Sequence, residues 1–237
     1  MKNEKLKVIY QDENLIVINK PAGIICFLEK EINKKTLINE LLEKFPDLKN
    51  VGNPPRYGTV HRLDKDTSGI ILIAKNNKAL DFFQKQFKDR NVTKKYIALV
   101  IGEIQRDKGK IETLIGRSQK NKKKQKAYLF TEPEAQRKGL REAITEYKIL
   151  EKFKEYTLVE IQPKTGRKHQ IRCHFTFLNH PIVGDKIYSF KNPKTLKNLK
   201  RQFLHASYLK IKLLNKKEKE FKSEIPNELN QILKNLK

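Results

Sequence analysis

The sequence predicts a chain that combines short β-strands with amphipathic α-helices around a hydrophobic core. Short runs of β-branched and other apolar residues bounded by turn-forming residues, such as residues 70–74, indicate strands. Apolar residues that recur every three or four positions, as in residues 36–45 and 76–88, indicate helices. The length of 237 residues allows one large domain or two small ones.

The N-terminal part predicts a hairpin followed by a helix. Residues 8–10 and 15–18 are apolar runs separated by polar turn formers, which is typical of two paired strands. Pro21 and Gly23 then end the second strand, since proline lacks an N–H donor and glycine tolerates positive φ. In residues 36–45 the leucines fall on one helical face, and the first residue of this range is a threonine suited to an N-cap.

The middle of the chain predicts one buried strand, one helix and three further strands. Residues 70–74 form a continuous apolar run after a glycine, and residues 76–88 carry apolar side chains at helical spacing. Strands are expected at residues 93–100, 143–150 and 156–161.

The remaining segments predict a loop and two helices. Residues 117–126 form a basic polar run without periodicity, so we expect a solvated loop that could also contact phosphates. One helix should begin near residues 167–169, and a second should follow Pro226 and dock through its leucine and isoleucine face.

The charge of the chain limits its partners. There are 52 Lys and Arg residues against 27 Asp and Glu, a net charge of +25, which predicts a polyanionic partner. Nucleic acid is the first candidate and an anionic membrane surface the second. No apolar run approaches the ~18 residues of a spanning helix, and the N-terminus has no signal-peptide core. We therefore expect a cytoplasmic protein, in which the isolated Cys26 and Cys173 need not be bonded.

Residues 61–75 form the stretch around which the chain is organised. Asp64 lies between Arg62 and Lys65 on a short loop that precedes the buried strand, so it is held at the rim of a rigid element. The neighbouring cations favour the ionised carboxylate, which would be available as a nucleophile. From the spacing alone, a turn cap or a local ion pair is the favoured use of Asp64, because surface charge clusters are common and contribute little energy.

Residues 163–175 form a second dense stretch. Two arginines, one lysine and two histidines gather near an expected helix start, where unpaired N–H groups would suit a phosphate or a carboxylate. His169 and His174 are five residues apart with no glutamate between them, which does not fit a zinc-binding helix, so we expect no metal.

The motifs in these stretches resemble those of one enzyme family. HRLDKDTSG closely resembles the HRLD-x-x-TSG element of the RluA-type pseudouridine synthases. KPAG at residues 20–23, KKYIALV at residues 94–100, TGRKHQIR at residues 165–172, HPIVGD at residues 180–185 and LHA at residues 204–206 resemble further elements in the family's order. Lys168 stands where the family often has threonine.

The resemblance implies an α+β fold, with a central mixed, mostly antiparallel sheet, flanking helices and a basic cleft. It implies a single pseudouridine synthase catalytic domain over residues 1–237. Because the first strand starts by Leu6, no N-terminal S4-type RNA-binding domain is expected.

The implied enzyme is an intramolecular transferase, an isomerase that converts specific uridines of ribosomal or transfer RNA to pseudouridine. In the family the aspartate of RLD is the essential catalytic residue, which corresponds to Asp64. Arg167 would pair with this carboxylate and keep it ionised. Tyr96 would lie against the target base and assist proton removal from C5. Whether Asp64 attacks C1′ of the ribose or C6 of the uracil stays open.

The same resemblance extends to substrate binding. Arg62 would contact a phosphate or fill the space left by a flipped base. Ile171 would make an apolar contact with the ring, and His61 and Lys94, which belong to the matched motifs, complete the expected substrate-binding set.

The reaction needs no redox change and no group donor, so no cofactor is expected. The expected partner is structured RNA, with no membrane, no obligate protein partner and a monomeric state. Two alternatives remain: a non-catalytic RNA-binding or ribosome-assembly protein, and a peripheral membrane protein, which would need a basic helix with bulky exposed apolar residues.

Overall fold

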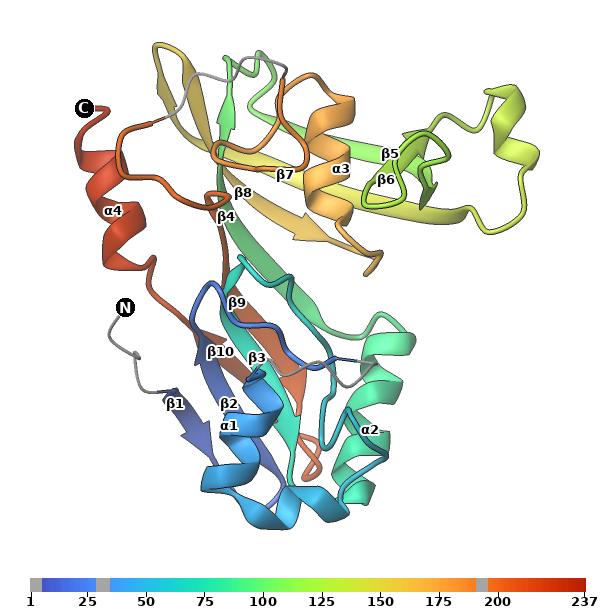
Figure 1. Cartoon of the computed structure of the whole chain (residues 1–237), viewed down its shortest axis with the longest axis vertical. Coiled ribbons are helices and arrows are strands. Elements are labelled where there is room, and N and C mark those ends of the chain that lie inside the picture. Colours follow the sequence, from blue (N-terminus) through green and yellow to red (C-terminus); the bar gives the residue numbers. More distant parts are fainter. Residues whose placement is uncertain (1–5, 29–34, 191–195) are drawn as a thin grey trace. The chain divides into compact units, whose positions relative to one another are not determined.

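The chain divides into two units, each assembled from two separate segments of sequence. The computed structural model describes residues 6–28, 35–190 and 196–237 (Figure 1). The first unit contains the chain up to Thr93 together with Ala206–Glu224, and the second contains Lys94–His205 together with Ile225–Lys237. Strand β9 (Leu204–Lys212) therefore begins in the second unit and continues into the first.

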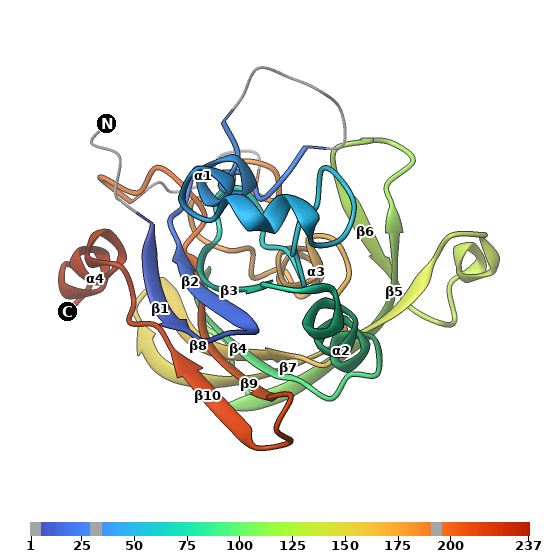
Figure 2. The same ribbon diagram turned by 90° about the horizontal axis from the view of Figure 1, so that it is seen from below.

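The first unit is a small sheet with helices beside β2 and β3 (Figure 2). The strand order is β1-β2-β3-β9, with β10 on β9, and the pairs β1–β2, β2–β3 and β9–β10 are antiparallel. Its elements are β1 (Lys7–Gln11), β2 (Leu15–Lys20), α1 (Leu37–Lys44), η1 (Pro46–Asn50), β3 (Ser68–Ala74), α2 (Asn77–Lys88) and β10 (Glu218–Lys222).

Strand β3 is the buried centre of this unit. All seven of its residues are buried, because β2 and β9 flank it and the apolar faces of α1 and α2 join the same core. Gly69 has a φ of +117°, and a Cβ at this position would collide with the backbone of Ala206 in β9. Only glycine therefore allows β3 to begin here, directly after the loop that carries Asp64.

The α-helices α1 and α2 of the first unit each begin at a side-chain cap. Thr36 Oγ1 accepts the N–H of Asn39 at 3.3 Å, and Asn39 Oδ1 accepts the N–H of Thr36 at 2.9 Å. Asn76 Oδ1 accepts the N–H of Ala79 at 2.9 Å at the start of α2. The helices predicted at residues 36–45 and 76–88 are thus confirmed, with their first residues serving as caps.

The second unit contains a larger sheet. Its strand order, starting from the first residues of β9, is β9-β4-β8-β7-β5-β6, and the pairs β4–β8, β7–β8, β5–β7 and β5–β6 are antiparallel. Its elements are β4 (Thr93–Ile101), β5 (Lys108–Arg117), β6 (Gln125–Tyr128), η2 (Pro133–Gln136), β7 (Arg141–Phe153), β8 (Tyr156–Pro163), α3 (Gln170–Phe177) and α4 (Asn227–Lys234).

The α+β class with a mixed sheet and flanking helices is confirmed, whereas the basic cleft stays a prediction. The helix after Pro226 docks as expected, since Leu229 and Ile232 are buried in the core of the second unit. Helix α3 begins at Gln170, directly after the expected range, and His169 precedes it in a left-handed conformation with φ of 54°.

The expectation for residues 117–126 was only partly right. Residues 118–124 form a loop, but Arg117 ends β5 and Gln125 begins β6. Ala127 and Tyr128 of β6 are buried, and β6 pairs with β5 through four residue pairs. The pairing of β5 with β6 stabilises strands here despite the polar composition. A prediction from single-residue preferences therefore missed the hairpin.

Within the part of the chain that the structure describes, no helix has the length and apolar character needed to cross a membrane.

His174 is the clearest source of pH-dependent stability in the second unit. Its ring is fully buried on α3, with Nε2 3.0 Å from the hydroxyl of Thr113 and Nδ1 2.8 Å from the hydroxyl of Thr145. Burial lowers the pKa of His174 to about 4, because the charged ring would lose its hydration.

We predict that protonation of His174 lowers the free energy of unfolding as the pH falls. Its folded pKa lies below the unfolded value, so its contribution is present above pH 6.5 and is lost as the pH falls toward 4. The loss should be about 2 kcal/mol by pH 5. Urea unfolding at pH 7 and pH 5 should show a smaller drop for His174→Gln, which does not titrate, than for wild type. Equal drops would contradict this assignment.

Candidate active site

The loop that carries Asp64 is held at its far end by main-chain contacts. The carbonyl of Asp64 accepts the N–H of Thr67 at 3.2 Å, which closes a turn just before β3. The carbonyl of Lys65 accepts the N–H of Gly23 at 2.9 Å. Asp64 itself is half-buried. The KPAG segment and the Asp64 loop therefore form one connected structure in the first unit.

A buried lysine joins the same two segments. Lys20 is fully buried, and its Nζ donates to the carbonyls of Pro21 at 2.8 Å, Ile24 at 2.9 Å and Lys65 at 3.0 Å. Three carbonyl dipoles offset the desolvation of this ammonium group. The positive charge of Lys20 thus lies directly behind the loop of Asp64. The sequence indicated only a turn here, since a lysine before a proline gives no sign of being buried.

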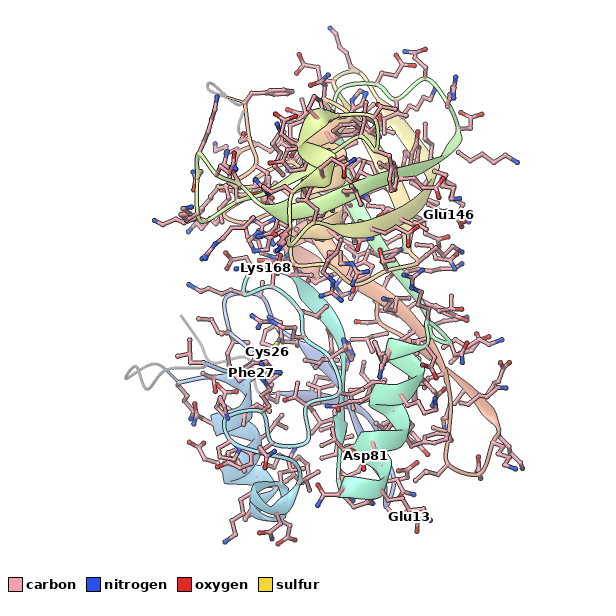
Figure 3. All side chains as sticks on the ribbon, turned by 90° about the vertical axis from the view of Figure 1, so that its right-hand side faces the viewer. Glu13, Cys26, Phe27, Asp81, Glu146 and Lys168 are labelled. Carbon is pink, nitrogen blue, oxygen red and sulfur yellow. The ribbon has the colours of Figure 1, made fainter. Side chains whose placement is uncertain are left out.

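The two residues that precede Leu63 make different contacts. His61 Nε2 accepts the N–H of Leu72 at 3.1 Å, and the ring stacks on Phe87 with centroids 4.5 Å apart. Arg62 is exposed and its guanidinium lies 5.0 Å from the ring centroid of Phe27, which Figure 3 labels. His61 therefore fixes the loop to β3, and the substrate-binding roles of both residues stay predictions.

The two cysteines are free, in line with the expectation that they need not be bonded, and both are buried. Cys26, beside Phe27 in Figure 3, donates its thiol to the carbonyl of Leu63 at 3.4 Å. Burial raises the pKa of Cys26 and raises that of Cys173 to about 12, so both stay protonated at neutral pH.

In the second unit, Gln170 organises the loop that carries Arg167. Its Oε1 accepts the N–H of Arg167 at 2.9 Å and the hydroxyl of Thr165 at 2.8 Å. Its Nε2 donates to the carbonyl of Ile144 at 3.0 Å and to the hydroxyl of Thr145 at 2.9 Å. One buried amide thus ties the TGR turn to β7 with its full set of hydrogen bonds.

The side chain of Arg167 is fixed by the same strand. Its Nε donates to the carbonyl of Glu142 at 2.8 Å, and the residue is half-buried. A guanidinium carries five N–H donors in one plane, so this bond sets the direction of the group and leaves its planar geometry suited to a carboxylate or phosphate.

Lys94, Tyr96 and Ile171 lie on the elements expected for them. Tyr96 is half-buried on β4, opposite Ile161 of β8. A Cβ placed on Gly166 would lie 3.9 Å from Lys94 Nζ, so Lys94 reaches the TGR turn. Burial lowers the pKa of Lys94 to about 8. Ile171 is only 6% exposed and belongs to the core, which leaves little of its surface for a ligand.

The basic cluster predicted around the start of α3 is smaller than expected. Arg172 is buried and forms a bidentate pair with Asp185, with bonds of 2.6 and 2.9 Å. His174 is also interior, whereas Lys168, labelled in Figure 3, is exposed. Arg172 and His174 therefore serve packing rather than an external anion. Asp185, the partner of Arg172, belongs to the HPIVGD motif, but the spacing of the two residues in the sequence gives no sign that they pair.

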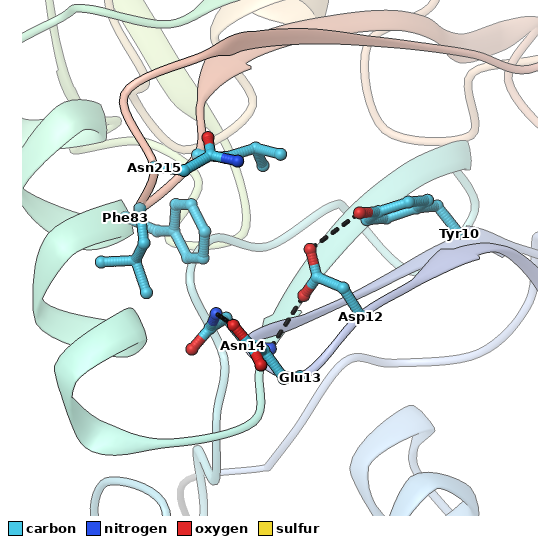
Figure 4. Close-up of a pocket in the computed structure, with 8 residues that line it drawn as sticks. Tyr10, Asp12, Glu13, Asn14, Phe83 and Asn215 are labelled. Carbon is cyan, nitrogen blue, oxygen red and sulfur yellow. Dashed lines mark hydrogen bonds between the residues drawn. The ribbon is translucent and has the colours of Figure 1, made fainter.

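Among residues 6–28, 35–190 and 196–237, no three His, Cys, Asp or Glu side chains gather as a metal site would require. A pocket of the first unit is lined by residues of the β1–β2 turn, α2 and the β9–β10 turn (Figure 4). There Asp12 accepts the hydroxyl of Tyr10 and the N–H of Asn14, both at 2.8 Å. None of the predicted site residues lines this pocket, and its polar atoms stabilise a turn.

We predict that Lys20→Met lowers the free energy of unfolding by about 3 kcal/mol, because three carbonyls lose a charged donor inside the protein. Lys65→Met is the matched control, since its side chain is exposed and only its carbonyl takes part. The control should change stability by less than about 0.5 kcal/mol. Chemical denaturation measures both, and an equal effect of the two substitutions would contradict the role of Lys20.

Comparisons with known proteins assign this chain to one family. Residues 14–177 match the family described as RNA pseudouridylate synthase. Ribosomal large subunit pseudouridine synthase D of Borreliella burgdorferi is 39% identical over 99% of this chain and 73% of its own length. An uncharacterised RNA pseudouridine synthase of Aquifex aeolicus is 39% identical over 83% of this chain and 60% of its own length.

A solved structure agrees with the sequence comparison. Human RNA Pseudouridylate Synthase Domain Containing 4 is 26% identical, with a TM-score of 0.77 over 97% of this chain and 92% of that one. The matched region includes the Asp64 loop, β4 and the TGR turn. The chain therefore belongs to the RluA-type RNA pseudouridine synthases, a family of isomerases that act on RNA.

Proposed function

We propose that this protein converts one or more uridines of large-subunit ribosomal RNA to pseudouridine, with Asp64 as the nucleophile. The observation that carries the proposal is the Asp64 loop, which is held between the buried β3 and the Lys20 ammonium in a chain of this family. The choice of ribosomal over transfer RNA rests on the name of the Borreliella burgdorferi relative.

The reaction requires a carboxylate that forms a covalent bond to the substrate and breaks it again within one turnover. In one route the Asp64 carboxylate attacks C1′ as the bond from C1′ to N1 breaks, and C5 of the rotated uracil later displaces the carboxylate from C1′. In the other route the carboxylate adds to C6 as the C5–C6 double bond opens. The bond from C1′ to N1 then breaks, C5 of the rotated ring bonds to C1′, and loss of the C5 proton restores the double bond and expels the carboxylate from C6. In both, C5 loses a proton and N1 gains one, so no external reagent is consumed. A nucleophile on a fixed loop suits either route, because the main chain that carries the carboxylate is held in place before the substrate binds.

Arg167 and Tyr96, which belong to the matched motifs, would assist Asp64. Arg167 would stabilise its ionised form, and the support is the TGR motif together with a guanidinium that Glu142 orients. Tyr96 would lie against the base and help to remove the proton from C5, and the support is its place in the KKYIALV motif on β4.

The cellular setting belongs to the same proposal. We take residues 1–237 to act as one catalytic domain, as a cytoplasmic monomer on structured RNA. The motifs that support this come from both units of the chain, and the net charge of +25 suits a polyanionic substrate.

We predict that Asp64→Asn lowers pseudouridine formation by on the order of 10³-fold or more, because a neutral amide is a poor nucleophile. The assay uses transcribed large-subunit ribosomal RNA and transfer RNA of the source organism, with modified sites mapped by carbodiimide-dependent primer-extension stops. Asp66→Asn, two residues away on the same loop, is the matched control and should retain activity.

The outcomes of this assay separate the alternatives. Modification of ribosomal RNA by wild type and by the Asp66→Asn control alone supports the proposal. Full activity of Asp64→Asn would exclude it as the nucleophile, and modification of transfer RNA alone would exclude the proposed substrate. No modification by any form, with intact RNA binding, would favour the non-catalytic RNA-binding alternative.

We predict that Arg167→Lys lowers the single-turnover rate about 10²-fold without unfolding the protein. An ammonium group cannot donate to the Glu142 carbonyl and present a planar pair of donors at once. Lys168→Arg, at the exposed neighbouring position, should keep the wild-type rate. Unchanged turnover in Arg167→Lys would show that its bidentate geometry has no role.

A further inference from the structure

Residues 117–141 of the second unit form a projection that we call the basic arm. It contains the loop of the β5–β6 hairpin, β6, and the segment with η2 that leads to β7. The segment with η2 extends away from the strands in both views (Figures 1 and 2). The basic arm carries nine Lys and Arg residues against two Glu residues, which makes it a local concentration of the positive charge of the chain.

The hairpin loop of the basic arm is built to present its lysines outward. The N–H of Ser118 donates to the carbonyl of Lys124 at 3.1 Å, and the N–H of Lys124 donates to the carbonyl of Asn121 at 2.9 Å. Arg117 Nε donates to the carbonyl of Lys122 at 3.2 Å. The main chain therefore satisfies its own hydrogen bonds, and the side chains of Lys122 and Lys123 are exposed.

Two large apolar side chains lie exposed in the same arm. Leu129 is 45% exposed and Phe130 is 54% exposed. The N–H of Glu132 donates to the carbonyl of Leu129 at 3.1 Å, and Glu132 Oε1 accepts the N–H of Leu129 at 2.8 Å. This reciprocal pair closes a turn with Phe130 at its tip. Exposure of two adjacent apolar side chains loses the favourable free energy of their burial, which indicates a contact surface.

The turn rests on a rigid base. Tyr128, which precedes Leu129, is buried, and the Lys126 Nζ and the Arg137 guanidinium lie 4.5 and 5.2 Å from its ring centroid. Arg137 Nη2 also donates to the carbonyl of Arg117 at 3.0 Å. The aromatic tip and the basic loop are thus joined through one arginine.

The basic arm is continuous with the loop of Arg167. Tyr128 of β6 pairs with Leu114 of β5, and Leu114 pairs with Glu142 of β7, whose carbonyl accepts Arg167 Nε. Two strand spacings place the backbones of Tyr128 and Glu142 about 10 Å apart, a distance that about three stacked nucleotides span.

We propose that the basic arm is an RNA-binding element, in which an unpaired base stacks on Phe130 while the surrounding lysines and arginines bind phosphates. This deepens the proposed function, on which it rests, because it names a part of the chain that holds nucleotides of the RNA substrate. Aromatic side chains beside cations are the usual way in which proteins bind single-stranded nucleic acid.

An anionic membrane is the other surface that combines apolar insertion with basic contacts. A membrane-binding element needs a broad apolar face that can enter the bilayer interface. The basic arm offers one turn with two exposed apolar residues in a segment rich in Lys and Arg, and this small area fits one or two bases. The observations therefore favour RNA.

The test is the affinity of the full chain for two RNA probes, measured by fluorescence anisotropy. One probe is an unpaired 20-nucleotide RNA of mixed sequence, and the other is a 20-base-pair RNA duplex. Phe130→Ala should weaken binding of the unpaired RNA about tenfold and leave binding of the duplex unchanged, because only an unpaired base can stack on the ring. Leu150→Ala, with 45% exposure on β7, is the matched apolar control and should bind both probes as wild type.

The charge contribution is tested separately. Lys122→Gln with Lys123→Gln should weaken binding of both probes and reduce the slope of log K against log salt concentration by about 1.5. Lys216→Gln with Lys217→Gln, an exposed lysine pair on the β9–β10 turn, is the matched control and should leave the slope unchanged.

Wild-type affinity of Phe130→Ala for the unpaired probe would overturn the stacking proposal, and an unchanged salt slope in the lysine variant would overturn the phosphate contacts. If the arm variants lose binding to phosphatidylglycerol vesicles but bind RNA as wild type does, the surface would be assigned to a membrane instead. If wild type binds RNA through the basic arm but forms no pseudouridine, the proposed function fails and this inference stands. If wild type is active and the arm variants keep its KM, this inference alone fails.

Discussion

The Nζ of Lys20 is surrounded by main-chain carbonyls in the interior of the first unit, and much of the local structure follows from it. A buried ammonium is stable only where several acceptors replace water. Those acceptors are Pro21 of the KPAG segment, Ile24 directly after it, and Lys65, the residue after Asp64. The position of the Asp64 loop is therefore fixed by the need to satisfy a charge behind it, and Gly69 permits β3 to start at the same place because no side chain meets β9.

In the second unit a neutral side chain, that of Gln170, holds the loop that carries Arg167. Gln170 uses both amide atoms to hold the turn of Thr165 and Arg167 against β7. Each loop that carries a proposed catalytic residue is thus attached to a strand by one buried polar side chain. Such supports leave the main chain of these loops little freedom, which is what pre-organised chemistry would require.

The sequence predicts elements well where one physical signal dominates. The buried run of β3, the capped helices α1 and α2, and the docked helix α4 follow from apolar spacing and cap residues. The hairpin of β5 and β6 was not predicted, because its lysines obscure the alternation of apolar and polar residues that is typical of strands. The motifs named the candidate site residues, which stay predictions. Lys20, Gln170 and Asp185 were not recognised as supports, because each makes a hydrogen bond to a residue 13 or more positions away in the sequence.

The division of β9 between the units has a consequence for biosynthesis. The first unit needs Ala206–Glu224, which supplies most of β9 and all of β10. As the chain leaves the ribosome, its first 93 residues emerge early, yet β3 has no β9 beside it until more than 200 residues have been made. The N-terminal unit of this protein therefore completes its folding late, in contrast to the usual order in which N-terminal domains finish first.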